Sequence, residues 1–97
     1  MVKHVIFWKL KAEEKANAAA HAKKLQSMFD GLIGNVEGLE QAEVGQNYNG
    51  GDFDLCLYTV FSSKEAERAY QTHPLHLEIK AVVAAIKEDR VCVDYER

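Results

Sequence analysis

A tyrosine and two histidines surround the only proline of the chain, in the segment Tyr70-Gln71-Thr72-His73-Pro74-Leu75-His76. Proline favours the first position of a helix, which would make His73 the N-cap and His76 the third helical residue. The positive end of the helix dipole disfavours an imidazolium, so His76 is predicted to be neutral and able to accept a proton near neutral pH. Tyr70 could donate a hydrogen bond to a carbonyl or enolate oxygen. These residue types suit proton abstraction next to a carbonyl.

Two residues far away in the sequence could complete such a site. Asp94 lies in the last apolar segment of the chain and could orient a histidine. His4 would lie on the same sheet face if the first and last strands pair. A base, a donor and an orienting carboxylate would then surround one cavity, and we predict His76 and Tyr70 as its catalytic residues.

Each of these residues also has a purely structural interpretation. His73 would only cap a helix, and Tyr70 and Pro74 would only fix the break between two helices. His4 would be a satisfied, half-buried histidine, Asp94 would pair with a nearby cation, and His21 would have a packing or surface role. His73 and His76 are spaced to share a metal, but no third ligand has convincing spacing, so we expect neither a metal nor another cofactor.

Hydrophobic periodicity and turn residues predict the elements that position these side chains. Apolar alternation indicates strands, and the stripe that includes Leu25 and Phe29 indicates a long amphipathic helix. Ser62 and Glu65 have the spacing of a capping box, and Pro74 should divide the second helical region. The expected strands are residues 2–10, 39–46, 53–61 and 90–95, and the expected helices are residues 12–33, 62–71 and 74–86.

The order βαββαβ predicts an α+β fold, a ferredoxin-like four-stranded antiparallel sheet with helices on one face, formed as one domain by residues 1–97. A cavity between the sheet and the helices is the natural ligand site. The residues that we expect to bind substrate there are His4, Ile6, Trp8, Leu57, His73 and Asp94.

The strands are apolar on both faces, which a single sheet layer does not require. The second face would expose Val5, Phe7, Cys56, Tyr58, Val60, Val91, Val93 and Tyr95. This patch is larger than those that soluble monomers usually expose. We therefore predict a homodimer, a dimeric α/β barrel in which two sheets pack face to face about a twofold axis.

Composition excludes several other classes of function. The 97 residues include 12 Lys and Arg against 15 Asp and Glu, for a formal charge of −3, without the basic stripe that nucleic acids require. No apolar run is long enough to cross a membrane, and no export signal is recognisable, so a cytoplasmic location is expected. Cys56 and Cys92 lack the spacing of a zinc or redox motif and fit free thiols in a reducing compartment.

Several motifs in order resemble the stress-responsive A/B barrel family. They are the opening Val2-Lys3-His4-Val5-Ile6-Phe7-Trp8-Lys9-Leu10-Lys11, Phe53-Asp54, Phe61-Ser62-Ser63, Tyr70-x-x-His73-Pro74-x-His76 and Val93-Asp94-Tyr95. The resemblance implies a dimeric α+β barrel of ferredoxin-like protomers. One family member is a plant polyketide cyclase that performs an aldol condensation without a cofactor. By motif, His76 and Tyr70 correspond to its catalytic residues, and His4 and Asp94 match residues near its site.

The leading hypothesis is therefore a homodimer that binds a small apolar carbonyl or phenolic ligand, with cofactor-free enolisation, aldol or cyclase-like chemistry. The alternative is a noncatalytic, stress-associated binding or structural protein in which the same residues fix the fold. A cofactor-free monooxygenase is a lesser alternative, because related barrels include such enzymes. The cyclase has bulky aromatic residues where this chain has the Ala-rich residues 18–22, so its substrate is not carried over.

Overall fold

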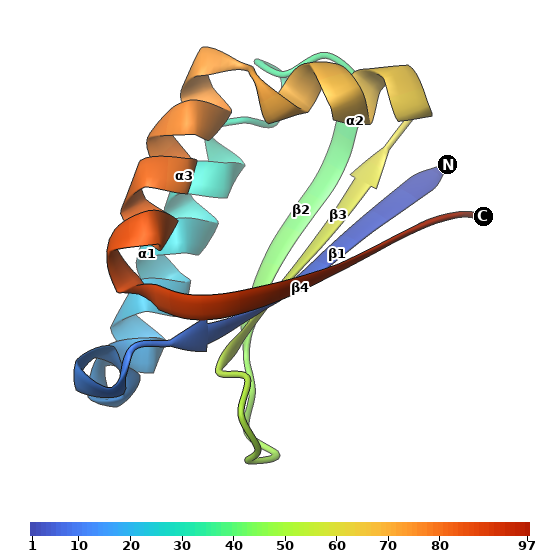
Figure 1. Ribbon diagram of the computed structural model, residues 1–97. Helices are drawn as coiled ribbons and strands as arrows, with labels where there is room; N and C mark the ends of the chain where they lie inside the picture. Colours follow the sequence, from blue (N-terminus) through green and yellow to red (C-terminus); the bar gives the residue numbers. More distant parts are fainter.

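A computed structural model describes residues 1–97 and has the predicted ferredoxin-like βαββαβ order. Its elements are β1 (Val2–Leu10), η1 (Ala12–Asn17), α1 (Ala18–Asp30), β2 (Leu39–Gln46), β3 (Leu55–Phe61), α2 (Lys64–Gln71), α3 (Pro74–Ile86) and β4 (Lys87–Glu96). The strands form one sheet in the order β2-β3-β1-β4, and every neighbouring pair is antiparallel. The helices cover one face of this sheet, with α2 crossing its end (Figure 1).

Strand β1 lies at the centre and shows why one face is a core. Its alternate residues, from Val2 to Leu10, are buried beneath the helices, whereas Phe7 between them is 43% exposed. Leu55 and Leu57 of β3 and Phe29 of α1 join the same apolar cluster. The period-2 alternation of a strand thus places His4, Ile6 and Trp8 on the helix-covered face, as the sequence predicts.

The first helical region differs from the expected single helix. Residues 12–17 form a short 3₁₀ helix with no buried residue, and the α-helix begins only at Ala18 and ends at Asp30. The charged 12–17 segment has no apolar face to pack, which accounts for the loss of regular α-helix there.

The cap of α2 is also shifted by one residue. Ser63, not Ser62, accepts a hydrogen bond from the Ala66 amide at 3.1 Å. The Ser62 amide instead donates to the Gly38 carbonyl. Helix α3 begins as predicted, with Pro74 in its first turn and the His73 ring accepting a hydrogen bond from the Leu75 amide.

Strand β4 starts at Lys87, directly after α3, and is longer than expected. Its antiparallel register with β1 pairs His4 with Asp94, Ile6 with Cys92 and Trp8 with Arg90. Paired residues share a sheet face, so Asp94 and Arg90 both lie on the helix-covered side. This register therefore places Asp94 and Arg90 of β4 at one edge of the candidate site.

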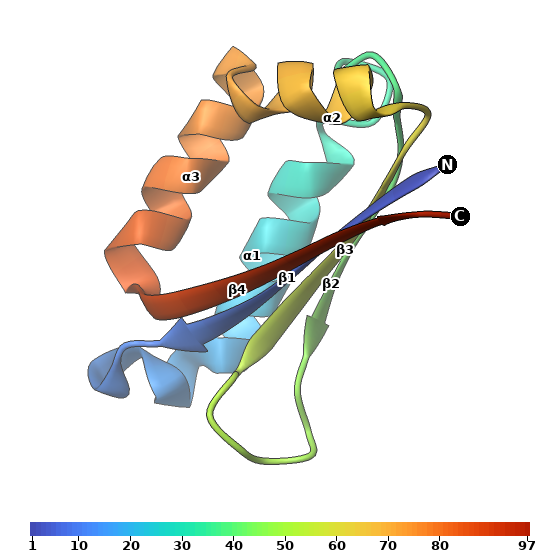
Figure 2. The same cartoon turned by 45° about the vertical axis from the view of Figure 1, so that its right-hand side comes forward.

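The opposite sheet face has no helical cover (Figure 2). Its large apolar side chains remain in water in the single chain, with exposed fractions of 43% for Phe7, 44% for Val91, 59% for Val93 and 45% for Tyr95. Val60, expected on this face, is only 5% exposed and adds little to the apolar surface.

Both cysteines are free thiols, and none of the helices combines the length and apolar character needed to span a bilayer.

Candidate functional site

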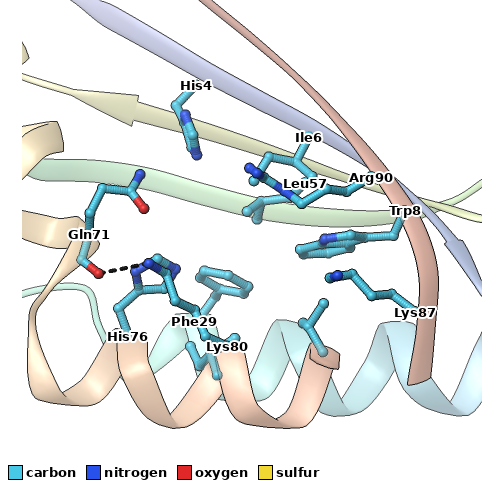
Figure 3. Close-up of a pocket in the computed structure, with 12 residues that line it drawn as sticks. His4, Ile6, Trp8, Phe29, Leu57, Gln71, His76, Lys80, Lys87 and Arg90 are labelled. Carbon is cyan, nitrogen blue, oxygen red and sulfur yellow. Dashed lines mark hydrogen bonds between the residues drawn. The ribbon is translucent and has the colours of Figure 1, made fainter. Parts of the chain in front are cut away.

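A cavity of about 230 Å³ lies between the sheet and α3 (Figure 3). Apolar residues form half of its lining, and the remainder is polar or basic. The lining residues are His4, Ile6, Trp8, Phe29, Leu57, Gln71, His76, Ile79, Lys80, Val83, Lys87 and Arg90. An apolar hollow with a few convergent polar groups is the usual form of a small-molecule site.

His4 and Asp94 form a hydrogen-bonded pair at one end of the cavity. His4 Nδ1 donates to the Asp94 carboxylate, and His4 is buried while the Asp94 side chain is half exposed. An ionised carboxylate only accepts hydrogen bonds, so Nδ1 carries the hydrogen. Nε2 is thus the ring atom left to act on a ligand, and the carboxylate stabilises the imidazolium formed when Nε2 takes a proton. The ring projects from β1 toward the cavity (Figure 3).

His76 faces His4 from α3 and is held in the neutral form. Its Nδ1 donates to the Tyr70 main-chain carbonyl at 3.1 Å, and the Gln71 main-chain carbonyl also acts on the ring. The dashed line in Figure 3 is a different hydrogen bond, from Lys80 Nζ to the Gln71 carbonyl. Burial, followed by the nearby charge of Lys80, lowers the His76 pKa to about 4. Since a carbonyl only accepts, Nδ1 carries the hydrogen and Nε2 keeps its lone pair. His76 is therefore a hydrogen-bond acceptor at neutral pH.

Tyr70 supports His76 rather than lining the cavity. The two rings stack with centroids 3.7 Å apart and an interplanar angle of 16°. Tyr70 is fully buried, and its hydroxyl has no hydrogen-bond partner. Burial raises the pKa of this phenol well above its usual range. Tyr70 is not among the residues that line the cavity.

The structure gathers most of the other residues expected to bind substrate. Ile6, Trp8 and Leu57 line the cavity with His4. Asp94 is not a lining residue and acts on the cavity through its hydrogen bond to His4. His73 also lies outside the lining and caps α3.

Sequence reasoning missed the basic residues of the cavity. Lys80 comes from α3, and Lys87 and Arg90 come from the start of β4. The alternation Arg90, Cys92, Asp94 could have indicated that Arg90 shares the face of Asp94. Lys87 could not be placed in this way, because the last strand was predicted to start at residue 90, whereas β4 starts at Lys87.

One set of side chains has the composition of a metal site. His4 Nδ1, Cys92 Sγ and Asp94 Oδ1 lie within 4.8 Å of one another. Imidazole, thiolate and carboxylate all ligate zinc. Here the His4–Asp94 hydrogen bond already uses two of the three donor atoms, and burial raises the pKa of the Cys92 thiol, which disfavours the thiolate that a metal requires.

A second hollow lies at the other face of the sheet, beside the β2–β3 hairpin. It has a volume of about 410 Å³ and is lined by residues that include Phe7, Gly45, Asn47, Phe53 and Cys56. No histidine faces it. His4 and His76 therefore line the first cavity and not this hollow.

The lowered pKa of His76 predicts a pH-dependent stability. Between the unfolded value of 6.5 and the folded value of about 4, the unfolded chain binds more protons, so the free energy of unfolding falls as the pH falls through this window. We expect a loss of about 2 kcal/mol between about pH 7 and pH 5. Urea unfolding at fixed protein concentration would measure it.

Two variants isolate the contribution of His76. His76→Gln cannot titrate and should remove most of the difference between the two pH values. His21→Gln is the matched control, because His21 pairs with Glu14 outside the cavity, and it should retain the difference. An unchanged pH dependence in His76→Gln would show that other groups cause it.

Comparisons with known proteins agree with this architecture. A family model described as the stress responsive A/B barrel domain matches residues 2–97. A dimeric ferredoxin-like protein of unknown function from Bacteroides fragilis is 32% identical, with a TM-score of 0.84, and the alignment covers 99% of this chain and 95% of that one. No curated protein matches the chain.

Two more distant solved structures share the fold. A dimeric ferredoxin-like protein of unknown function from Thermobifida fusca has 19% identity and a TM-score of 0.82, covering 99% of this chain and 90% of that chain. A protein from Nitrosomonas europaea, provisionally described as an antibiotic biosynthesis monooxygenase, has 15% identity and a TM-score of 0.78. The alignment covers 100% of this chain and 98% of that chain. At these identities the likeness concerns the fold alone.

Proposed function

Because the chain belongs to the stress responsive A/B barrel domain family, we propose that it is a homodimer whose cavity binds a small, mostly apolar carbonyl or phenolic compound and moves a proton on it without a cofactor. One observation carries this proposal. Two imidazole rings, His4 and His76, each have Nδ1 fixed by an acceptor and Nε2 left for a ligand, at one end of an apolar cavity.

We assign the two histidines different roles. His4 is the proton acceptor, because the Asp94 carboxylate stabilises the positive charge that the ring gains. His76 is a weak base with its pKa of about 4, so it accepts a hydrogen bond from a hydroxyl of the ligand instead. This division modifies the sequence-based hypothesis, which made His76 the base.

The open sheet face is the proposed dimer interface. Phe7, Val91, Val93 and Tyr95 expose apolar surface that a partner sheet would bury. The Bacteroides and Thermobifida relatives are described as dimeric, which supports self-association. An isologous pairing of this face would remove the apolar surface from water in both copies.

A noncatalytic binding or structural role is the second candidate, and one observation favours it. Tyr70, predicted from the sequence as the hydrogen-bond donor, is buried and does not line the cavity. A cofactor-free monooxygenase remains the lesser alternative.

A thermal-shift screen with phenols, keto acids and polyketide-like compounds tests the proposal. We expect some of these compounds to raise the melting temperature, because a ligand that binds only the folded protein stabilises it. His76→Ala should remain a folded dimer but lose this response. If no compound stabilises the wild type, and His76→Ala loses only stability or assembly, the noncatalytic candidate is favoured.

The Tyr70 hydroxyl gives a separate prediction. Tyr70→Phe removes a buried donor that has no partner, so the free energy of unfolding should stay the same or rise by about 1 kcal/mol. The thermal shift produced by a ligand should not change. A variant of full stability that no longer responds to ligand would instead support Tyr70 as the donor predicted from the sequence.

A further inference from the structure

The charged lysine and arginine side chains that line the cavity are all positive. Its lining includes Lys80, Lys87 and Arg90 but no aspartate or glutamate. The whole chain has the opposite balance, with a formal charge of −3. Three cations around one hollow of an acidic protein repel one another, and this repulsion is relieved when an anion binds between them.

Two of these cations are free to meet a ligand. Lys80 Nζ donates to the Gln71 carbonyl at 2.9 Å. The ion pairs of the chain involve neither Lys87 Nζ nor the Arg90 guanidinium. Both groups therefore retain unused donors at the cavity.

The side chains of Arg90 and Lys87 point toward residues that line the cavity. The Arg90 side chain runs from β4 toward Ile6 and Leu57, and the Lys87 ammonium lies near Trp8 on the side of α3 (Figure 3). A guanidinium presents planar paired donors that fit a carboxylate.

We propose that the cavity takes an organic carboxylate, with the anionic group held by Arg90 and Lys87 and an apolar body packed against Ile79 and Val83. This proposal rests on the proposed function and narrows its ligand class from carbonyl or phenolic compounds to those that also carry a negative charge. The carboxylate would fix the orientation of the ligand beneath His4.

The fluorescence of Trp8 can report ligand binding directly, because Trp8 is the only tryptophan of the chain and lines the cavity. The probes are cyclohexanecarboxylate, cyclohexanemethanol and cyclohexanemethylamine, which have similar bodies and differ in charge. We expect the carboxylate to change Trp8 fluorescence with an affinity at least about tenfold higher than the alcohol at low salt, and the amine to bind most weakly. The preference should shrink at about 0.5 M salt, because Arg90 is exposed to solvent.

Variants separate the cavity charge from the net charge. Arg90→Gln should reduce the affinity for the carboxylate to nearly that for the alcohol. Lys24→Gln changes the net charge equally on the exposed surface of α1 and should leave the preference intact. Equal affinities for carboxylate and alcohol in the wild type would overturn the proposal of a carboxylate ligand. The proposal that the cavity binds a small ligand would not be affected. No fluorescence response to any of the three probes would overturn both proposals.

Discussion

Replacing Val93 by aspartate is expected to convert the proposed homodimer into monomers of 10.9 kDa at micromolar concentration. Val93 is 59% exposed in the single chain and pairs with Val5 on the open sheet face. In a face-to-face dimer the substitution would bury a carboxylate from each copy in the interface. Burial of an unpaired charge is costly, and we expect the dissociation constant to rise at least about a hundredfold.

Leu77→Asp is the matched control for Val93→Asp. Leu77 is also an exposed apolar residue, 48% exposed, but it lies on α3 rather than on the open sheet face. Sedimentation of both variants should show a dimer for Leu77→Asp and a monomer for Val93→Asp. The reverse result would move the interface to the helical layer, and a monomeric wild type would exclude the dimer.

Replacing His4 by glutamine is expected to slow proton abstraction from a carbonyl ligand at least about a hundredfold. In the proposed step His4 Nε2 takes a proton from the carbon beside the carbonyl, and the electron pair of that C–H bond moves to the carbonyl oxygen to give an enolate. Glutamine keeps a polar group on β1 but cannot take the proton. Asp94→Asn should cause a smaller loss, about tenfold, because the ring loses its anionic partner but keeps its base.

The rate can be followed by proton NMR in D₂O with 4-oxocyclohexanecarboxylate, whose hydrogens beside the ketone exchange for deuterium through the enolate. His21→Gln is the control, because it also removes a histidine but lies outside the cavity. It should exchange the ligand hydrogens at the wild-type rate. If His4→Gln retains the wild-type rate while remaining folded, His4 is not the base.

The fold was predictable because its signals are local and periodic. Alternation in β1, the helical stripe of α1 and the proline at α3 each determine an element from a few neighbouring residues. The boundaries were less predictable. The start of β4 depends on pairing with β1, and the 3₁₀ segment at residues 12–17 depends on the absence of a packing partner, and neither property is local.

The candidate site was predictable to the extent that it follows from strand pairing. His4 and Asp94 form a hydrogen bond because their strands are adjacent, and His76 lines the same cavity as His4 because Pro74 starts α3. Two features depend on the packed environment instead. The burial that lowers the pKa of His76 and the burial of Tyr70 outside the cavity lining arise from side chains of several elements, so the residue types alone do not reveal them.

The hollow beneath α3 is the proposed ligand site of the chain. The most direct test is an NMR titration of methyl-labelled protein with cyclohexanecarboxylate. We predict shift changes concentrated at the methyl groups of Ile6, Leu57, Ile79 and Val83, which line the cavity. Changes confined to Leu55, beside the second hollow, or no changes at any methyl group, would contradict the claim.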